Sequence, residues 1–86
     1  MFTGSTALRG WRSETRQSQV AVARSLGVGQ STVAEWEAGG RRPEFHLAVR
    51  LEALSDGAVT LEAWGYDAAV VAAMGTLVDR RRAEAA

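Results

Sequence analysis

Residues 18–36 read S-Q-V-A-V-A-R-S-L-G-V-G-Q-S-T-V-A-E-W, and the rest of the chain is organised around this stretch. Its pattern predicts a short helix that Ser18 caps and that ends at Gly27, followed by a turn and a second short helix over about 30–38. Glycine suits the end of the first helix because it adopts the left-handed conformation without a Cβ clash. Gly29 can then cap the second helix. Six apolar residues are spaced to meet in one small core: Ala21, Val22, Leu26, Val28, Val33 and Trp36.

Two helices set at a steep angle by a short glycine-containing turn form a helix-turn-helix unit, whose second helix enters the major groove of DNA. In this chain the second helix opens with two polar residues, Gln30 and Ser31. A glutamine can form two hydrogen bonds with an adenine edge, and a serine can bond either type of base. Both residues are therefore candidates for base contact. The alternative is that they only solvate the start of a helix.

The same stretch and its continuation carry a resemblance to a known family. The pattern S-Q-x-x-V-A-x-x-L-G-V-x-x-S-T-V-x-x-W-E-x-G, followed by R-R-P, resembles lambda-repressor-like helix-turn-helix regulators of the Cro and Xre type. The run R-P-E-F-H-L-A-V-R-L-E-A-L-S-D-G-A-V-T-L-E-A-W is similar to the small Cro/YdaS-like prophage regulators. The resemblance spans about 8–64. It implies a sequence-specific regulator of transcription that binds double-stranded DNA, a repressor of bacterial or phage origin.

The resemblance also implies roles for individual residues. It places four residues of the 30–38 helix at the bases: Gln30, Ser31, Ala34 and Glu35. Gln19 matches a family glutamine that bonds a phosphate and braces the recognition helix. Further candidates for phosphate contact are Thr32, Arg41 and Arg42, although a solvated loop is the alternative for the two arginines. Many members pair an arginine with a glutamate at the positions of Arg12 and Glu37, so we assign both to structure.

The remaining chain predicts an all-α fold: a compact five-helix domain over 1–66 with an additional C-terminal helix in 67–86. Thr3 or Ser5 is expected to cap a first helix that ends near Glu14 and turns Leu8 and Trp11 inward. Pro43 suits the first turn of a fourth helix through about Leu54, and Thr60 caps a short fifth helix over 61–64. The apolar positions of the fourth helix are Phe45, Leu47, Val49, Leu51 and Leu54.

The C-terminal segment carries an apolar stripe at three- and four-residue spacing: Val70, Val71, Met74, Leu77 and Val78. Such a stripe needs a partner surface. We expect it to form the contact of a homodimer or to cover the domain's own core. A protein-interaction module, such as an antitoxin or a phage accessory protein with the same fold, is the alternative function. The stripe and the acidic second half of the chain favour that alternative.

Composition argues against several other classes of protein, namely metalloproteins, enzymes and membrane proteins. The 86 residues include no cysteine, and the one histidine, His46, has no clustered carboxylates, so we expect no metal and no cofactor. No serine lies in a recognisable nucleophile motif, which argues against an enzyme. Without a long apolar run or a signal segment, we expect a cytoplasmic protein, associated with the nucleoid or in a phage host, with no membrane contact. The net charge is zero, but residues 1–42 contain six arginines and three glutamates. The positive charge therefore lies in the half of the chain that contains the predicted helix-turn-helix.

Overall fold

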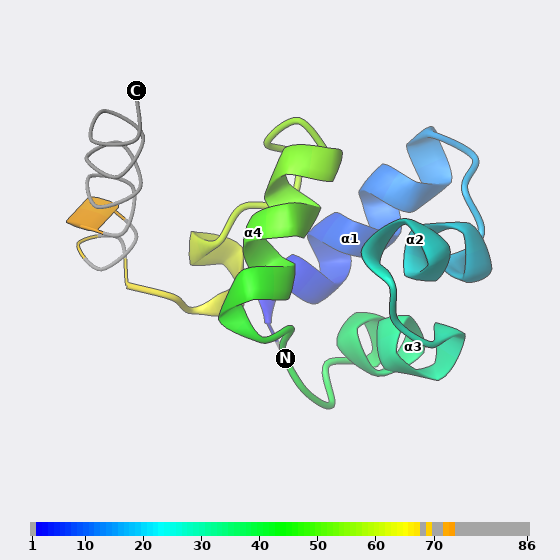
Figure 1. The fold of residues 1–86 in the computed structure, drawn as a ribbon, viewed down its shortest axis with the longest axis horizontal. Helices are drawn as coiled ribbons and strands as arrows, with labels where there is room; N and C mark the ends of the chain where they lie inside the picture. Colours follow the sequence, from blue (N-terminus) through cyan, green and yellow to red (C-terminus); the bar gives the residue numbers. More distant parts are fainter. Residues whose placement is uncertain (1, 68, 70–71, 74–86) are drawn as a thin grey trace, which may run out of the picture.

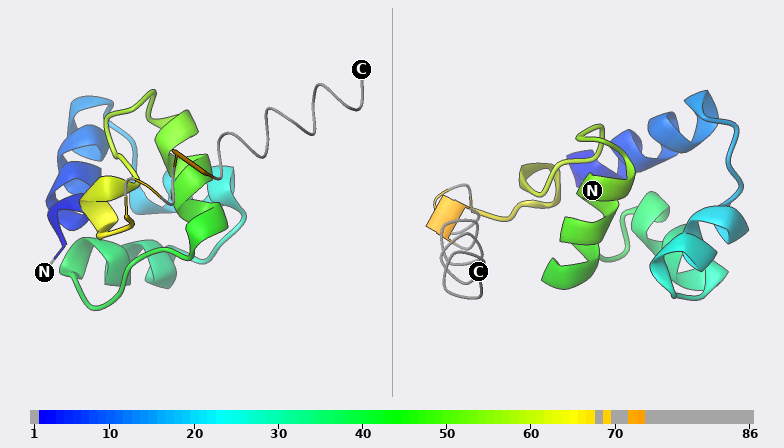
Figure 2. Two further views of the ribbon diagram at one scale, coloured as in Figure 1. Left: turned by 90° about the vertical axis from the view of Figure 1, so that its left-hand side faces the viewer. Right: turned by 45° about the horizontal axis from the view of Figure 1, so that its top comes forward.

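The structure is a computed structural model and describes residues 2–67, 69, 72 and 73. Four α-helices, α1 (Thr3–Glu14), α2 (Gln19–Leu26), α3 (Gln30–Ala38) and α4 (Phe45–Leu54), are followed by one 3-10 turn, η1 (Glu62–Trp64). Within the described part no strand occurs, which confirms the all-α prediction. α2 and α3 form a corner, α1 packs on α3, and α4 reaches α2 from the other side (Figure 1). Figure 2 shows η1 lying beside α1.

The central two-helix unit has the predicted boundaries. The Ser18 Oγ accepts a hydrogen bond from the Ala21 N–H at 3.0 Å and so caps α2. Gly27 ends α2 in the left-handed conformation with φ of 71°, and Gly29 precedes α3 in an extended conformation. The local signals in the sequence therefore determine this part of the fold.

Two predictions outside that unit are corrected. Neither Thr3 nor Ser5 caps α1, because both lie inside the helix and Phe2 takes the N-cap position without a side-chain bond. The Ser5 hydroxyl instead donates to the Trp36 carbonyl oxygen, which ties α1 to α3. Pro43 precedes α4 and does not lie in its first turn.

The predicted fifth helix is a 3-10 turn of three residues, η1. Leu61, not Thr60, takes the N-cap position of η1, although the Thr60 Oγ1 accepts a hydrogen bond from the Ala63 N–H at 3.2 Å. Of the predicted helix over 67–86 the structure describes only residues 67, 69, 72 and 73, and the stripe from Val70 to Val78 lies outside the described residues, so this helix stays a prediction.

The core gathers side chains from all of these elements. The buried apolar residues are Leu8, Val22, Ala23, Leu26, Val33, Trp36, Ala48, Leu51, Val59, Leu61 and Trp64. Two of the apolar residues of α4, Val49 and Leu54, are each 41% exposed. Alternate positions along a helix point to different sides, so the five apolar residues of α4 cannot share one face. The inward face of α4 is formed by Ala48 and Leu51.

Each of the four α-helices ends in the same hydrogen-bond pattern, the Schellman motif, in which a left-handed residue closes the last turn. Glycine holds the left-handed position after α2 and α3, at Gly27 and Gly39. After α1 and α4 the position is held by Arg16, with φ of 55°, and by Asp56, with φ of 52°. Around Arg16, the Gln17 N–H bonds the Arg12 carbonyl at 2.9 Å and the Arg16 N–H bonds the Ser13 carbonyl at 3.2 Å.

Replacing Arg16 by glycine should raise the free energy of unfolding by about 0.5–1 kcal/mol. The left-handed conformation costs a residue with a Cβ roughly 1–2 kcal/mol, and the extra chain entropy of glycine offsets about half of that. Urea denaturation of the variant provides the measurement. Arg16→Ala is the control, because it removes the charge but keeps the Cβ. An equal gain in the alanine variant would assign the effect to charge and contradict the backbone explanation.

Candidate nucleic-acid interface

α3 presents a polar face opposite its buried one. Val33 and Trp36 are fully buried, so they anchor the helix to the core, and Trp36 cannot serve as a platform for a base. On the outer side Gln30, Ser31 and Glu35 are exposed, while Thr32 and Ala34 are half-buried. Because residues three and four apart share a helix face, the structure groups the four predicted base-contact residues along one side of α3.

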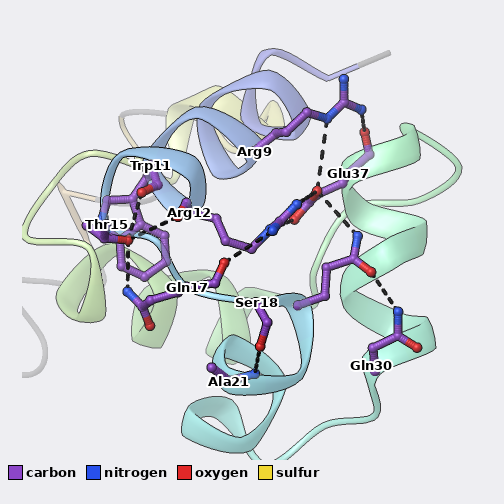
Figure 3. Close-up of polar contacts among 10 residues, drawn as sticks. Arg9, Trp11, Arg12, Thr15, Gln17, Ser18, Ala21, Gln30 and Glu37 are labelled. Carbon is purple, nitrogen blue, oxygen red and sulfur yellow. Dashed lines mark hydrogen bonds and ion pairs between the residues drawn. The ribbon is translucent and has the colours of Figure 1, made fainter.

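A chain of three polar side chains fixes the first residue of that face. The Gln30 Nε2 donates to the Gln19 Oε1 at 2.6 Å. The Gln19 Nε2 in turn donates to the Glu37 Oε1 at 3.4 Å. Figure 3 shows Gln30 at one end of this chain and Glu37 at the other. This contact from α2 to the start of α3 is the bracing that the resemblance implied for Gln19. It leaves the side-chain Oε1 and the second Nε2–H of Gln30 for an outside partner.

Glu37 is the centre of a buried ion pair. It is 3% exposed and accepts two hydrogen bonds from Arg12, from Nε to Oε2 at 2.7 Å and from Nη2 to Oε1 at 2.9 Å (Figure 3). This two-point geometry is the strong form of an arginine–carboxylate contact. The pair joins α1 to α3 and lies next to Gln19, so the structural assignment of Arg12 and Glu37 agrees with the geometry.

The surroundings shift the pKa of both partners. Burial alone would raise the pKa of Glu37, but hydrogen bonds from Arg12 and Gln19 and the charges of Arg12 and Arg9 together hold it below its ordinary value. The hydrogen bond to Glu37 raises the pKa of Arg12, and the charge of Glu37 adds to this against the opposing effect of burial. The pair is therefore ionised at neutral pH.

Arg9 is a member of this cluster that the sequence reasoning missed. Its Nη2 donates to the Glu37 carbonyl oxygen at 2.7 Å, and its Nε lies 3.9 Å from the Glu37 Oε1 (Figure 3). The available signal was its spacing, because Arg9 lies one helical turn before Arg12 on the same face of α1. A cation at the last carbonyls of α3 also complements the helix dipole.

The two neighbouring arginines after α3 have different partners. Arg41 forms an ion pair with Glu35, with 3.5 Å between Nε and Oε2, and both side chains are exposed. Arg42 turns toward η1: its Nη1 donates to the Trp64 carbonyl at 3.3 Å, and its guanidinium lies 4.2 Å from the centre of the Tyr66 ring. The structure thus separates two residues that the sequence placed in one group, and it brings Arg41 alone to the side of Glu35.

The described part of the chain has neither a candidate metal cluster nor a helix that could span a membrane. No group of three or more histidines, cysteines or acidic residues there could hold a metal ion. None of the helices there has both the length and the apolar character that crossing a membrane requires.

Comparison with known proteins gives one match. A family model described as helix-turn-helix matches residues 15–54, which span α2, α3 and α4. No curated protein and no solved structure matches the chain. The matched segment contains the corner of α2 and α3, the exposed face of α3 and the Gln19–Gln30 contact. Residues 15–54 of this chain therefore belong to the helix-turn-helix family of DNA-binding domains, of the Cro/C1 type.

Proposed function

We propose that the protein is a sequence-specific regulator of transcription that inserts α3 into the major groove of double-stranded DNA and represses by covering a promoter. The observation that carries this proposal is the exposed polar face of α3, whose first residue, Gln30, is held in place by Gln19. A side chain fixed before binding loses less conformational entropy when it meets its partner.

Each residue of the interface has a proposed role. Gln30 and Ser31 bond base edges, Ala34 contacts a thymine methyl group, and Glu35 accepts from the N4 amino group of a cytosine. Gln19 and Thr32 contact phosphates beside the groove. Arg41 and Arg42 grip phosphates from the loop after α3, Arg42 with the N–H groups that it does not direct at Trp64.

A single unit of this kind reads few base pairs, so we propose a homodimer on two half-sites about one helical turn apart. The stripe of the C-terminal segment (Val70, Val71, Met74, Leu77 and Val78) is the proposed dimer contact. We also propose that the regulator acts in the cytoplasm, on the nucleoid of a bacterium or in a phage host.

A second candidate function is protein binding, as in an antitoxin or a phage accessory protein. The exposed apolar side chains Val49 and Leu54 of α4 favour it, together with the acidic residues that follow α3. Salt separates the two candidates. Binding through phosphates weakens steeply as salt rises, whereas an apolar contact between proteins responds weakly.

Selection from a randomised duplex library tests the proposal. We expect the protein to enrich a defined motif, arranged as an inverted repeat if it binds as a dimer. The double variant Gln30→Ala, Ser31→Ala should relax the motif at the positions it reads, because each good two-point contact contributes roughly 1–3 kcal/mol of discrimination.

The matched control is Thr6→Ala, Ser13→Ala, which removes the same number of polar groups from exposed positions on α1 and should leave the motif unchanged. If the folded protein enriches nothing at low salt, the proposal is wrong.

A further inference from the structure

Glu35 and Arg41 meet because of the way α3 ends. Gly39 adopts a left-handed conformation with φ of 80°. The Gly40 N–H then bonds the Glu35 carbonyl at 3.1 Å, and the Gly39 N–H bonds the Trp36 carbonyl at 3.2 Å. Arg41 follows this closed turn directly, and its side chain reaches Glu35 in the second turn of α3. The hydrogen-bonded turn thus fixes the backbone from which the exposed Arg41 side chain forms its ion pair with Glu35 at 3.5 Å.

The position of the pair matters for a protein that approaches DNA with α3. Glu35 is on the proposed reading face, and Arg41 is a proposed phosphate contact. A phosphate and the Glu35 carboxylate are both anions that bind a guanidinium in the same manner, so they compete for Arg41. While Glu35 holds Arg41, the pair carries no net charge and attracts the DNA backbone less than a free arginine does.

Arg42 shows that the arrangement is particular to Arg41. Its partners are a carbonyl oxygen and an aromatic ring, neither of which is charged, so Arg42 keeps its full positive charge toward solvent. Of the two arginines in the loop between α3 and α4, only Arg41 is paired with an acidic side chain of the described residues.

We propose that Glu35 is a specificity-determining residue that acts through Arg41. On a duplex of unmatched sequence Glu35 retains Arg41, and binding is weak. Where a base presents a hydrogen-bond donor to Glu35, as the N4 amino group of cytosine does, the carboxylate bonds the base and releases Arg41 to a phosphate. The inference rests on the proposed function and adds to it the coupling of one base contact to one phosphate contact.

A double-mutant cycle tests the coupling. We would measure the affinity of the full chain, Glu35→Gln, Arg41→Gln and the double variant for a mixed-sequence duplex between 50 and 200 mM salt. With Arg41 present, Glu35→Gln should strengthen binding roughly fivefold at 50 mM salt, the upper end of what an exposed ion pair contributes. It should also steepen the dependence of log K on log salt by up to about 0.9, the value for one added phosphate contact.

In the Arg41→Gln background the same substitution should change affinity much less. An equal gain in both backgrounds would mean that Glu35 only repels phosphates directly, and no gain in either would mean that it does not restrain Arg41; both results overturn the proposal. Glu44→Gln is the matched control, since it removes an exposed carboxylate from the loop that contains Arg41, and among the described residues Glu44 lies close to His46, at 3.6 Å, and forms no ion pair with an arginine. Any effect of Glu44→Gln on affinity should be the same with Arg41 present and in the Arg41→Gln background.

A second measurement addresses specificity itself. The ratio of affinity for the selected duplex to affinity for the mixed duplex should fall in Glu35→Gln, and an unchanged or larger ratio overturns the specificity role. Failure of the proposed function is seen separately, because the unmodified protein would then bind neither duplex at 50 mM salt.

Discussion

Replacing Glu37 by alanine should lower the free energy of unfolding by about 3 kcal/mol. The side chain is 4% exposed and accepts both hydrogen bonds of the Arg12 fork, and the Arg12 side chain is itself only 23% exposed. Removing the carboxylate leaves a largely buried guanidinium without its counter-charge, which costs about 3–5 kcal/mol in fully buried pairs. The partial exposure of Arg12 places the expected loss at the low end. Chemical denaturation at pH 7 provides the measurement.

The size of that loss is large for this protein. A chain of 86 residues is expected to have a total stability of roughly 4–13 kcal/mol. The exposed Glu14, at the end of α1, is the matched control, and Glu14→Ala should change stability by less than about 0.5 kcal/mol. A loss below about 1 kcal/mol in Glu37→Ala would contradict the large contribution of the Arg12–Glu37 pair to stability.

The same pair predicts a dependence on pH. The pKa of Glu37 is held below its ordinary value of 4.5 in the folded protein. A lowered pKa contributes stability that is complete above the unfolded value and is lost as the pH falls through the folded value. The stability of the protein should therefore decline below about pH 4.5. Glu37→Gln should be less stable at pH 7, and its free energy of unfolding should fall less steeply with pH on the acid side. An acid limb as steep in Glu37→Gln as in the unmodified protein would assign the decline to other carboxylates.

The sequence predicts best the parts of the fold that are governed by neighbouring residues. The boundaries of α2 and α3 follow from Ser18, Gly27 and Gly29, each of which acts within one turn of its own position. The start of α1 could not be predicted in this way. Ser5 has the chemistry of a cap, but a tertiary bond to the Trp36 carbonyl draws it into the helix and the core.

In the candidate site, too, local features are easier to predict from the sequence than contacts between distant segments. The bracing role of Gln19 came from the resemblance, and its contact with Gln30 agrees with it. The different partners of Arg41 and Arg42 could not be predicted from the sequence, because they depend on the closed turn at Gly39 and on the position of Tyr66. Tyr66 lies outside the span of the resemblance, yet its hydroxyl donates to the Pro43 carbonyl at 2.7 Å and its ring supports Arg42. Contacts between distant segments decide which side chains of a basic loop stay available.

Gly4→Ala is expected to destabilise the protein by about 1–2 kcal/mol, although alanine is the better helix former. Gly4 is buried in the first turn of α1, and a Cβ atom there would lie 2.4–2.6 Å from three atoms of the Trp64 ring. Those atoms belong to a rigid ring that is fully buried and also packs against Phe2. Relieving the overlap requires α1 and η1 to move apart. Overpacking of this kind typically costs about 1–3 kcal/mol, and the roughly 1 kcal/mol gained in helix propensity offsets only part of that cost.

The same helix contains the control. A Cβ atom at Gly10 would meet no atom within 4 Å, and the residue is exposed, so Gly10→Ala should stabilise the protein by up to about 1 kcal/mol. One substitution in one helix is thus expected to have opposite signs at two positions, and thermal or urea denaturation of both variants measures the difference. If Gly4→Ala stabilised the protein as Gly10→Ala does, the close packing of Trp64 on α1 would be wrong. The attachment of η1 to the helix-turn-helix unit would then need a different explanation.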